Sequence, residues 1–164
     1  MSELAWNEQV EPITRTIDES TESALEFNVM PDRPVRETLH IKRYRIGHRF
    51  IEAQFDRTYV SSMLKSPSHL IFLTALVHTQ KILYVYACHE LGLEYDPYGP
   101  EVLKIWPTQV EIQMPRMVRN ESDLTHTVHI DSFERLAEGR HHIVMRSEIN
   151  GCIYINGETP VYVL

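Results

Sequence analysis

The histidine at position 78 is the residue whose neighbours most strongly suggest chemistry. It lies in a long apolar run, with Thr74 four residues before it and Lys81 three residues after it. On a helix these spacings place the three side chains along one stripe. A buried histidine flanked in this way could act as a general base, either for hydrolysis or for removing a proton next to a carbonyl group. It could equally be a core histidine that is hydrogen-bonded to a strand.

The other histidines do not suggest a metal centre, although the chain has nine in all. His126 and His129 are three apart in a predicted strand, so their side chains point to opposite faces. The sequence has no His-Glu-x-x-His motif, no cysteine cluster and no glycine-rich phosphate loop. It also lacks the Gly-x-Ser-x-Gly turn that exposes a serine nucleophile. We therefore expect no metal and no cofactor, and any hydrolysis would use an activated water.

Length, charge and cysteine content favour one soluble, cytoplasmic protein. The chain has 164 residues, of which 43% are hydrophobic and 24% charged. Its net charge of −7 argues against a nucleic-acid-binding protein, because such binding requires neutralisation of phosphates. Only two cysteines are present, Cys88 and Cys152, and there is no signal peptide and no apolar run long enough to span a bilayer. A reducing compartment follows from this pattern.

The first 34 residues have the composition of an acidic N-terminal arm. Residues 1–35 contain eight acidic side chains against Arg15 and Arg33, which gives a net charge of −6. They show no sustained periodicity, so we expect an extended arm with a short helix near residues 19–27. Residues 35–164 then form a single domain.

The hydrophobic pattern of this domain predicts one long helix preceded by strands. Residues 40–55 alternate between apolar and polar types, which indicates one or two half-buried strands. Ser66 at the cap, Pro67 at the first helical position and Gly92 after the end predict a helix over residues 66–91. Because this helix is apolar nearly all the way round, it must be covered on most sides.

The remaining chain has the pattern of four consecutive antiparallel strands. They are predicted at residues 102–114, with an interruption at Pro107, and at 124–133, 142–149 and 152–164. Asn150-Gly151 is a strong signal for a two-residue hairpin, and Asn156-Gly157 suggests a bulge or bend. The whole order predicts an α+β fold in which an antiparallel sheet wraps around one long central helix.

This order of elements resembles the hotdog fold, the superfamily of acyl-thioester thioesterases and acyl-carrier-protein dehydratases. The resemblance covers about residues 40–164. Residues 73–80, Leu-Thr-Ala-Leu-Val-His-Thr-Gln, are similar to the start of the family's central helix. The chain departs from that pattern at Thr74, where relatives have an acidic residue, and at His78, where many have glutamine. The family's His-Phe-Pro loop is also missing, because no proline follows His-Arg-Phe at 48–50.

The resemblance implies that the ligand carbonyl lies against the amides at the N-terminus of the central helix. Free N–H groups with the helix dipole behind them stabilise a developing oxyanion. These donors would belong to Ser68, His69 and Leu70, since Pro67 has no N–H group. Alternatively, residues 66–68 are simply a good helix cap. His69 could donate to the carbonyl or activate water, or it could be an exposed first-turn histidine.

The candidate site therefore has two groups of residues. His78, His69 and Thr74 are the catalytic candidates, and Ser68, Leu70, Tyr59 and Lys81 are the substrate-binding candidates. Tyr59 could give a phenolic donor to a substrate oxygen, although a tyrosine in the core is the more common case.

The function implied by the resemblance is hydrolysis of an acyl-CoA or acyl-carrier-protein thioester. Two alternatives stay open: a dehydratase or isomerase acting on a β-hydroxy- or β-ketoacyl thioester, and a non-catalytic module that binds an acyl ligand or a protein. The missing helix acid favours the last of these. The resembled proteins dimerise, so we expect a homodimer or a dimer of dimers, with no nucleic acid or membrane as partner.

Overall fold

A computed structural model describes residues 13–20, 25–63, 65 and 67–164, and within residues 13–30 it describes the backbone alone. Within these described residues, one α-helix and nine strands follow one another. Before the helix come β1 (Ile13–Ser20), β2 (Leu25–Met30), β3 (Arg33–Gly47) and β4 (Phe50–Ser61). After α1 (Phe72–Glu90) come β5 (Leu103–Ile105), β6 (Gln109–Gln113), β7 (Leu124–Ala137), β8 (Arg140–Ile149) and β9 (Ile153–Val163).

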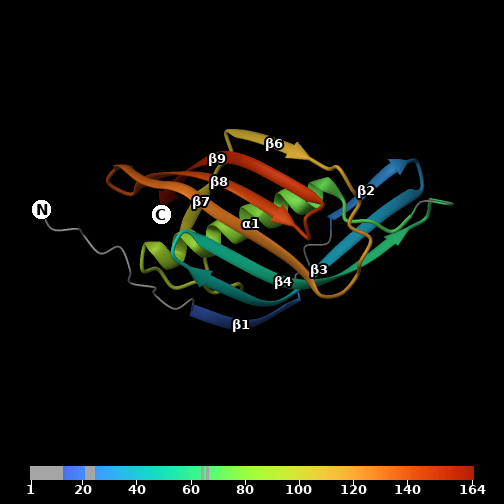
Figure 1. Ribbon diagram of the computed structural model, residues 1–164, viewed down its shortest axis with the longest axis horizontal. Coiled ribbons are helices and arrows are strands. Elements are labelled where there is room, and N and C mark those ends of the chain that lie inside the picture. Colours follow the sequence, from blue (N-terminus) through green and yellow to red (C-terminus); the bar gives the residue numbers. More distant parts are fainter. Residues whose placement is uncertain (1–12, 21–24, 64, 66) are drawn as a thin grey trace, which may run out of the picture.

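The strands form one antiparallel sheet that curves around α1 (Figure 1). The sheet order is β1-β3-β4-β7-β8-β9-β5, while β2 pairs with β3 and β6 pairs with β9. An antiparallel sheet wrapped around a single central helix is the hotdog arrangement. The predicted α+β hotdog fold is therefore confirmed.

The alternation in β3 and β4 decides which side chains face the helix. In β3 the buried positions change from odd to even numbers at a register shift between Ile41 and Arg43. The extra residue of such a bulge turns the following side chains to the other face, so Tyr44 and Ile46 return to the core. Both strands consequently bury a long row of apolar residues against α1.

The helix begins at Phe72, six residues later than predicted from Ser66, so the predicted start is wrong. The residues before it are held by tertiary hydrogen bonds: Leu70 N donates to Val118 O at 2.8 Å, and Ile71 N donates to Glu37 Oε2 at 3.0 Å. These bonds keep Ile71, the N-cap residue, in an extended conformation. The glycine stop signal is confirmed, because Gly92 takes a positive φ of 66° directly after the helix.

In its N-terminal half, α1 is covered by the sheet on one face only. Its inner face is buried and includes Ala75, His78 and Ile82. On its outer face the side chains of Phe72 and Val77 are 47% and 52% exposed. The C-terminal half of α1 is covered on most sides, as predicted, because residues 82–88 are buried except for the half-buried Tyr84, and only the N-terminal half keeps an open face.

The strands after the helix agree with the prediction except in their connectivity. Pro107 separates β5 from β6, as expected, and β7, β8 and β9 pair one after another. β5 and β6, however, both pair with β9 and not with β7, which follows them in the chain. Asn150 and Gly151 form the predicted hairpin turn, with φ values of 49° and 61°. β9 has no bulge at Gly157, because its register with β8 is unbroken. A Cβ atom at Gly157 would lie 2.8 Å from Gln109 O, so glycine here permits the close approach of β6.

Part of the predicted acidic arm belongs to the sheet, since the backbones of β1 and β2 both pair with β3. The prediction of a short helix near residues 19–27 is wrong for those residues of the range that the structure describes. Glu19 and Ser20 lie in β1, residues 25–27 lie in β2, and residues 21–24 lie outside the described residues. The domain boundary at residue 34 stays a prediction. In the described part of the chain, no helix is both long and apolar enough to cross a membrane.

Candidate functional site

A fully buried ion pair lies beneath the start of α1. Arg57 Nη1 donates to Glu37 Oε1 at 3.0 Å, and both side chains have no exposed surface. The same guanidinium donates to Asn120 O at 2.7 Å, to Arg119 O at 3.1 Å and to Ser68 Oγ at 3.0 Å. A buried charge requires such partners, because it has lost its hydration. The pair therefore holds β3 and β4 together with the connecting segments that contain Ser68 and Asn120.

The second oxygen of Glu37 caps the helix. Glu37 Oε2 accepts the Ile71 amide, and a carboxylate at a helix N-terminus is favoured by the helix dipole. Burial raises the pKa of Glu37, whereas the nearby Thr74 hydroxyl, the Ile71 amide and the Arg57 guanidinium all act to lower it. Sequence reasoning missed this pair. The signal was available, because Glu37 and Arg57 both occupy inward positions of alternating strands.

The predicted carbonyl-binding residues do not belong to the first helical turn. Leu70 N is engaged by Val118 O, and Ser68 Oγ donates to Glu121 Oε1 at 3.1 Å. His69 Nδ1 lies 2.8 Å from Pro67 O, so it donates to that carbonyl. The assignment of the first-turn amides to 68–70 is therefore wrong.

The actual first-turn donors come later in the chain. Ala75 N is bonded to Ile71 O at 3.0 Å, so the amides of Phe72, Leu73 and Thr74 precede the first intrahelical bond. Tyr59 lies close to the predicted turn, with its ring centroid 5.9 Å from that of His69. The substrate-binding roles given to Tyr59, Ser68 and Leu70 stay predictions.

His78 is hydrogen-bonded to a second histidine on the sheet. Its Nδ1 lies 3.1 Å from Nδ1 of His126 on β7, and His126 Nε2 lies 3.4 Å from Thr79 Oγ1. Burial lowers the pKa of both imidazoles, that of His126 to about 3, and Lys81 lowers that of His78 further. Both rings are therefore neutral at physiological pH.

The hydrogen-bond network assigns the tautomers of the pair. Thr79 Oγ1 gives its single proton to Ala75 O at 2.8 Å, so it must accept from His126 Nε2–H. Nδ1 of neutral His126 then accepts from His78 Nδ1–H. His78 Nε2 consequently keeps its lone pair, and this atom is buried without a hydrogen-bond partner among the described residues.

The two catalytic candidates on α1 thus lie on its inner face. Exposure is 3% for His78 and 5% for Thr74, and Phe55 packs edge-on against the His78 ring at 4.8 Å between centroids. This geometry agrees with a core histidine bonded to a strand. A role of His78, Thr74 or His69 in catalysis stays a prediction.

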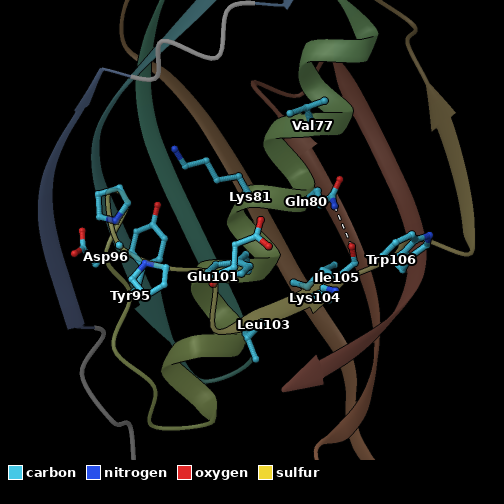
Figure 2. Close-up of a pocket in the computed structure, with 14 residues that line it drawn as sticks. Val77, Gln80, Lys81, Tyr95, Asp96, Glu101, Leu103, Lys104, Ile105 and Trp106 are labelled. Carbon is cyan, nitrogen blue, oxygen red and sulfur yellow. Dashed lines mark hydrogen bonds between the residues drawn. The ribbon is translucent and has the colours of Figure 1, made fainter. Parts of the chain in front are cut away.

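The open face of α1 borders a groove of about 560 Å³, which we call the α1–β5 groove (Figure 2). One wall is formed by α1 from Val77 to Tyr84, and the other by the connection 95–101 together with β5 and Trp106. Lys81, one of the predicted substrate-binding residues, lines this groove. The walls are therefore partly apolar and aromatic, with charged side chains between them.

Two hydrogen bonds fix the groove's walls relative to each other. Gln80 Nε2 donates to Ile105 O at 3.0 Å, and Val102 N donates to the Tyr84 hydroxyl at 2.9 Å. The Tyr95 ring packs edge-on against Tyr84, with centroids 6.0 Å apart. Because α1 is bonded both to β5 and to the residue that precedes β5, the groove is preformed. Within the described part of the chain, no three His, Cys, Asp or Glu side chains are grouped so that they could hold a metal ion.

No family model and no curated protein matches the sequence. Similar solved structures include a thioesterase from Haemophilus influenzae, at 16% identity and a TM-score of 0.47, covering 77% of this chain and 79% of that one. The PaaI protein of the phenylacetic acid degradation operon of E. coli covers the same shares at 11% identity and a TM-score of 0.46. A mutant thioesterase from Pseudomonas aeruginosa has 14% identity and a TM-score of 0.46, covering 76% of this chain and 82% of that one.

At TM-scores below 0.5 these likenesses do not by themselves assign an activity or a substrate. The sheet order and the enclosed helix define the class of the protein: it has the hotdog fold. A fold hosts many functions, so the chemistry must be argued from the groove and the buried pairs.

Proposed function

We propose that this protein binds an acyl thioester in the α1–β5 groove and hydrolyses it with water. The observation that supports the proposal is that the groove combines apolar side chains with positively charged ones. Val77 and Trp106 offer apolar contact to an acyl chain, while Lys81 and Lys104 offer cations to the phosphates of a CoA or carrier-protein arm. An acyl-CoA or acyl-carrier-protein thioester carries both an apolar acyl chain and phosphate groups.

The groove also has a donor for the thioester carbonyl. Gln80 gives one N–H to Ile105 O, and a side-chain amide nitrogen carries two N–H groups. The second can donate to a ligand oxygen, with Lys81 on the next position of the same helix. Charge that develops on the carbonyl oxygen would be stabilised by such donors.

Binding without turnover is the second candidate, and one observation favours it. His78 and Thr74, the residues at the positions of the family's amide and acid, are buried on the inner face of α1. A general base must reach the water that it activates. If neither residue does so, the groove could serve as an acyl-ligand site alone.

We further propose that the protein is a homodimer. The open face of α1 exposes two neighbouring apolar side chains, Phe72 and Leu73, at 47% and 36%. Exposed apolar clusters of this kind mark contact surfaces. Light scattering of the full chain tests the proposal, and a monomer at micromolar concentration would contradict it.

The free thiols of Cys88 and Cys152 support a reducing compartment such as the cytoplasm.

The proposed activity is tested with a panel of acyl-CoAs of different chain lengths. Release of free thiol measures turnover, and binding is measured separately by calorimetry. We expect turnover for at least one chain length, and we expect Trp106→Ala to weaken binding about tenfold. Tyr98→Ala is the matched control, because Tyr98 is 80% exposed and does not line the groove. Binding without turnover would support the second candidate, and neither binding nor turnover would contradict both.

A further inference from the structure

We propose that Glu101 is the general base that activates the hydrolytic water in the α1–β5 groove. This inference rests on the proposed function and names the residue that would carry its chemical step. Thr74 stands at the helix position where relatives have an acid, and the acid that α1 does contain, Glu90, lies at its C-terminal end and does not line the groove. Glu101 approaches from the opposite wall, eleven residues after the helix ends at Glu90.

The backbone next to the exposed Glu101 side chain is held in place through the following residue. Val102 N donates to the Tyr84 hydroxyl at 2.9 Å, and Val102 O accepts Leu164 N at 3.0 Å. One bond ties this segment to α1 and the other to the end of β9. Figure 2 shows the Glu101 side chain in the middle of the groove, between Gln80 and Tyr95. A base in a hydrolase needs this kind of rigid support.

The other titratable side chains of the groove are less suited to the role. Asp96 Oδ1 accepts Tyr98 N at 2.9 Å and closes a turn, and Figure 2 places Asp96 away from the centre. Lys81 and Lys104 are cations and have no lone pair to accept a proton. The Tyr84 hydroxyl already accepts the Val102 amide. Among the described residues no hydrogen bond or ion pair engages the Glu101 carboxylate, which leaves it available to water.

In the proposed hydrolysis, the Glu101 carboxylate carries out both proton transfers. A water oxygen bonds to the acyl carbon while the Glu101 carboxylate takes one of the water's protons. The C–S bond then breaks, and the electron pair leaves with sulfur. The thiolate receives the proton from the Glu101 carboxyl group, which returns to its ionised form. The products are a carboxylic acid and a free thiol.

The test compares Glu101→Gln with Glu94→Gln, which alters an exposed glutamate of the same connecting segment that does not line the groove. We expect Glu101→Gln to lower kcat at least 100-fold, with acyl-CoA binding changed less than threefold. Glu94→Gln should leave both unchanged. Glu101→Ala should regain part of its turnover in added formate, because a small carboxylate can replace a missing base.

Three outcomes separate this inference from the proposed function. If the unmodified protein binds acyl-CoA but releases no thiol, the hydrolase proposal fails, and the role of Glu101 fails with it. If it turns over and Glu101→Gln retains more than a third of kcat, Glu101 is not the base although the hydrolase proposal stands. In a single turnover in ¹⁸O-water, the first product must carry the label. An unlabelled first product would instead show that Glu101 attacks the acyl carbon directly.

Discussion

The two long faces of α1 both mix polar with apolar side chains, but they use the polar groups differently. On the inner face, His78 and Thr79 are within 3% of complete burial; His78 Nδ1 bonds to His126, and Thr79 Oγ1 bonds to the helix backbone. On the outer face, Gln80 and Lys81 line an open groove. Burial makes the inner polar groups depend on their protein partners, whereas the outer ones can exchange partners with a ligand. Changes to the inner face should therefore affect stability, and changes to the outer face should affect binding.

The largest effect is expected at the buried ion pair beneath the start of α1. Arg57→Met leaves the Glu37 carboxylate buried without its cation, which should lower the free energy of unfolding by about 3–5 kcal/mol in urea titrations. The double variant Arg57→Met with Glu37→Leu should recover most of this loss, because no unpaired charge remains. Arg45→Met is the exposed control, and it should cost less than about 1 kcal/mol. A loss of under 1 kcal/mol for Arg57→Met would contradict this prediction.

A smaller loss is expected when the histidine pair is broken. His126→Phe removes the acceptor for His78 Nδ1–H and should lower stability by about 1–3 kcal/mol. His129→Phe, an exposed neighbour on the same strand, should change it little. Nitrogen NMR of the unmodified protein should find the proton on Nδ1 of His78 and on Nε2 of His126. The opposite tautomers would refute the proton order that we derive from Thr79.

The same pair should make stability depend on pH. Burial lowers the pKa of both imidazoles below the unfolded value, so the unfolded chain binds more protons than the folded one between about pH 6.5 and the folded values. The pair therefore makes its full contribution to the free energy of unfolding above about pH 6.5. This contribution falls as the pH is lowered, by about 1.4 kcal/mol per pH unit for each histidine. Urea unfolding between pH 7.5 and 5 measures this slope. The double variant His78→Leu with His126→Leu should flatten it, and an unchanged slope would assign the effect to other groups.

The smallest change in stability is expected on the outer face. Val77 is 52% exposed, so Val77→Ala should alter the free energy of unfolding by no more than about 0.5 kcal/mol. The same measurement on Ile82→Ala, at a fully buried position of the inner face, should show a loss of about 2–5 kcal/mol. If acyl-CoA occupies the groove, Val77→Ala should weaken its binding while Ile82→Ala affects binding only through folding. Equal losses of stability for the two variants would remove the distinction between the faces.

Much of the fold could be predicted because its signals are local. The Asn150-Gly151 turn and the glycine stop at Gly92 need a positive φ, and the sequence shows this directly. The helix start could not be predicted in the same way. Ser66 and Pro67 are good cap residues, but hydrogen bonds from Leu70 and Ile71 to distant parts of the chain hold the backbone extended until Phe72.

The candidate site was only partly predictable, for the same reason. Lys81 lines the groove, and its predicted role in substrate binding stays a prediction. Glu101 has no local pattern that marks it, because its segment is bonded to α1 and to the chain end. His126 was considered only as a metal ligand and rejected. Its pairing with His78 joins residues 48 positions apart, and no local spacing encodes such a contact.

The sequence by itself determined that this chain has one central helix within an antiparallel sheet, since period, turn residues and caps act over a few neighbouring positions. The tertiary structure alone decided which face of that helix is open. It also decided that Glu37 and Arg57 neutralise each other. His78 faces the sheet, where it bonds to His126, while Glu101 lines the groove. These outcomes depend on the curvature of the sheet and on the pairing of β5 with β9. Both bring together residues that are far apart in the chain.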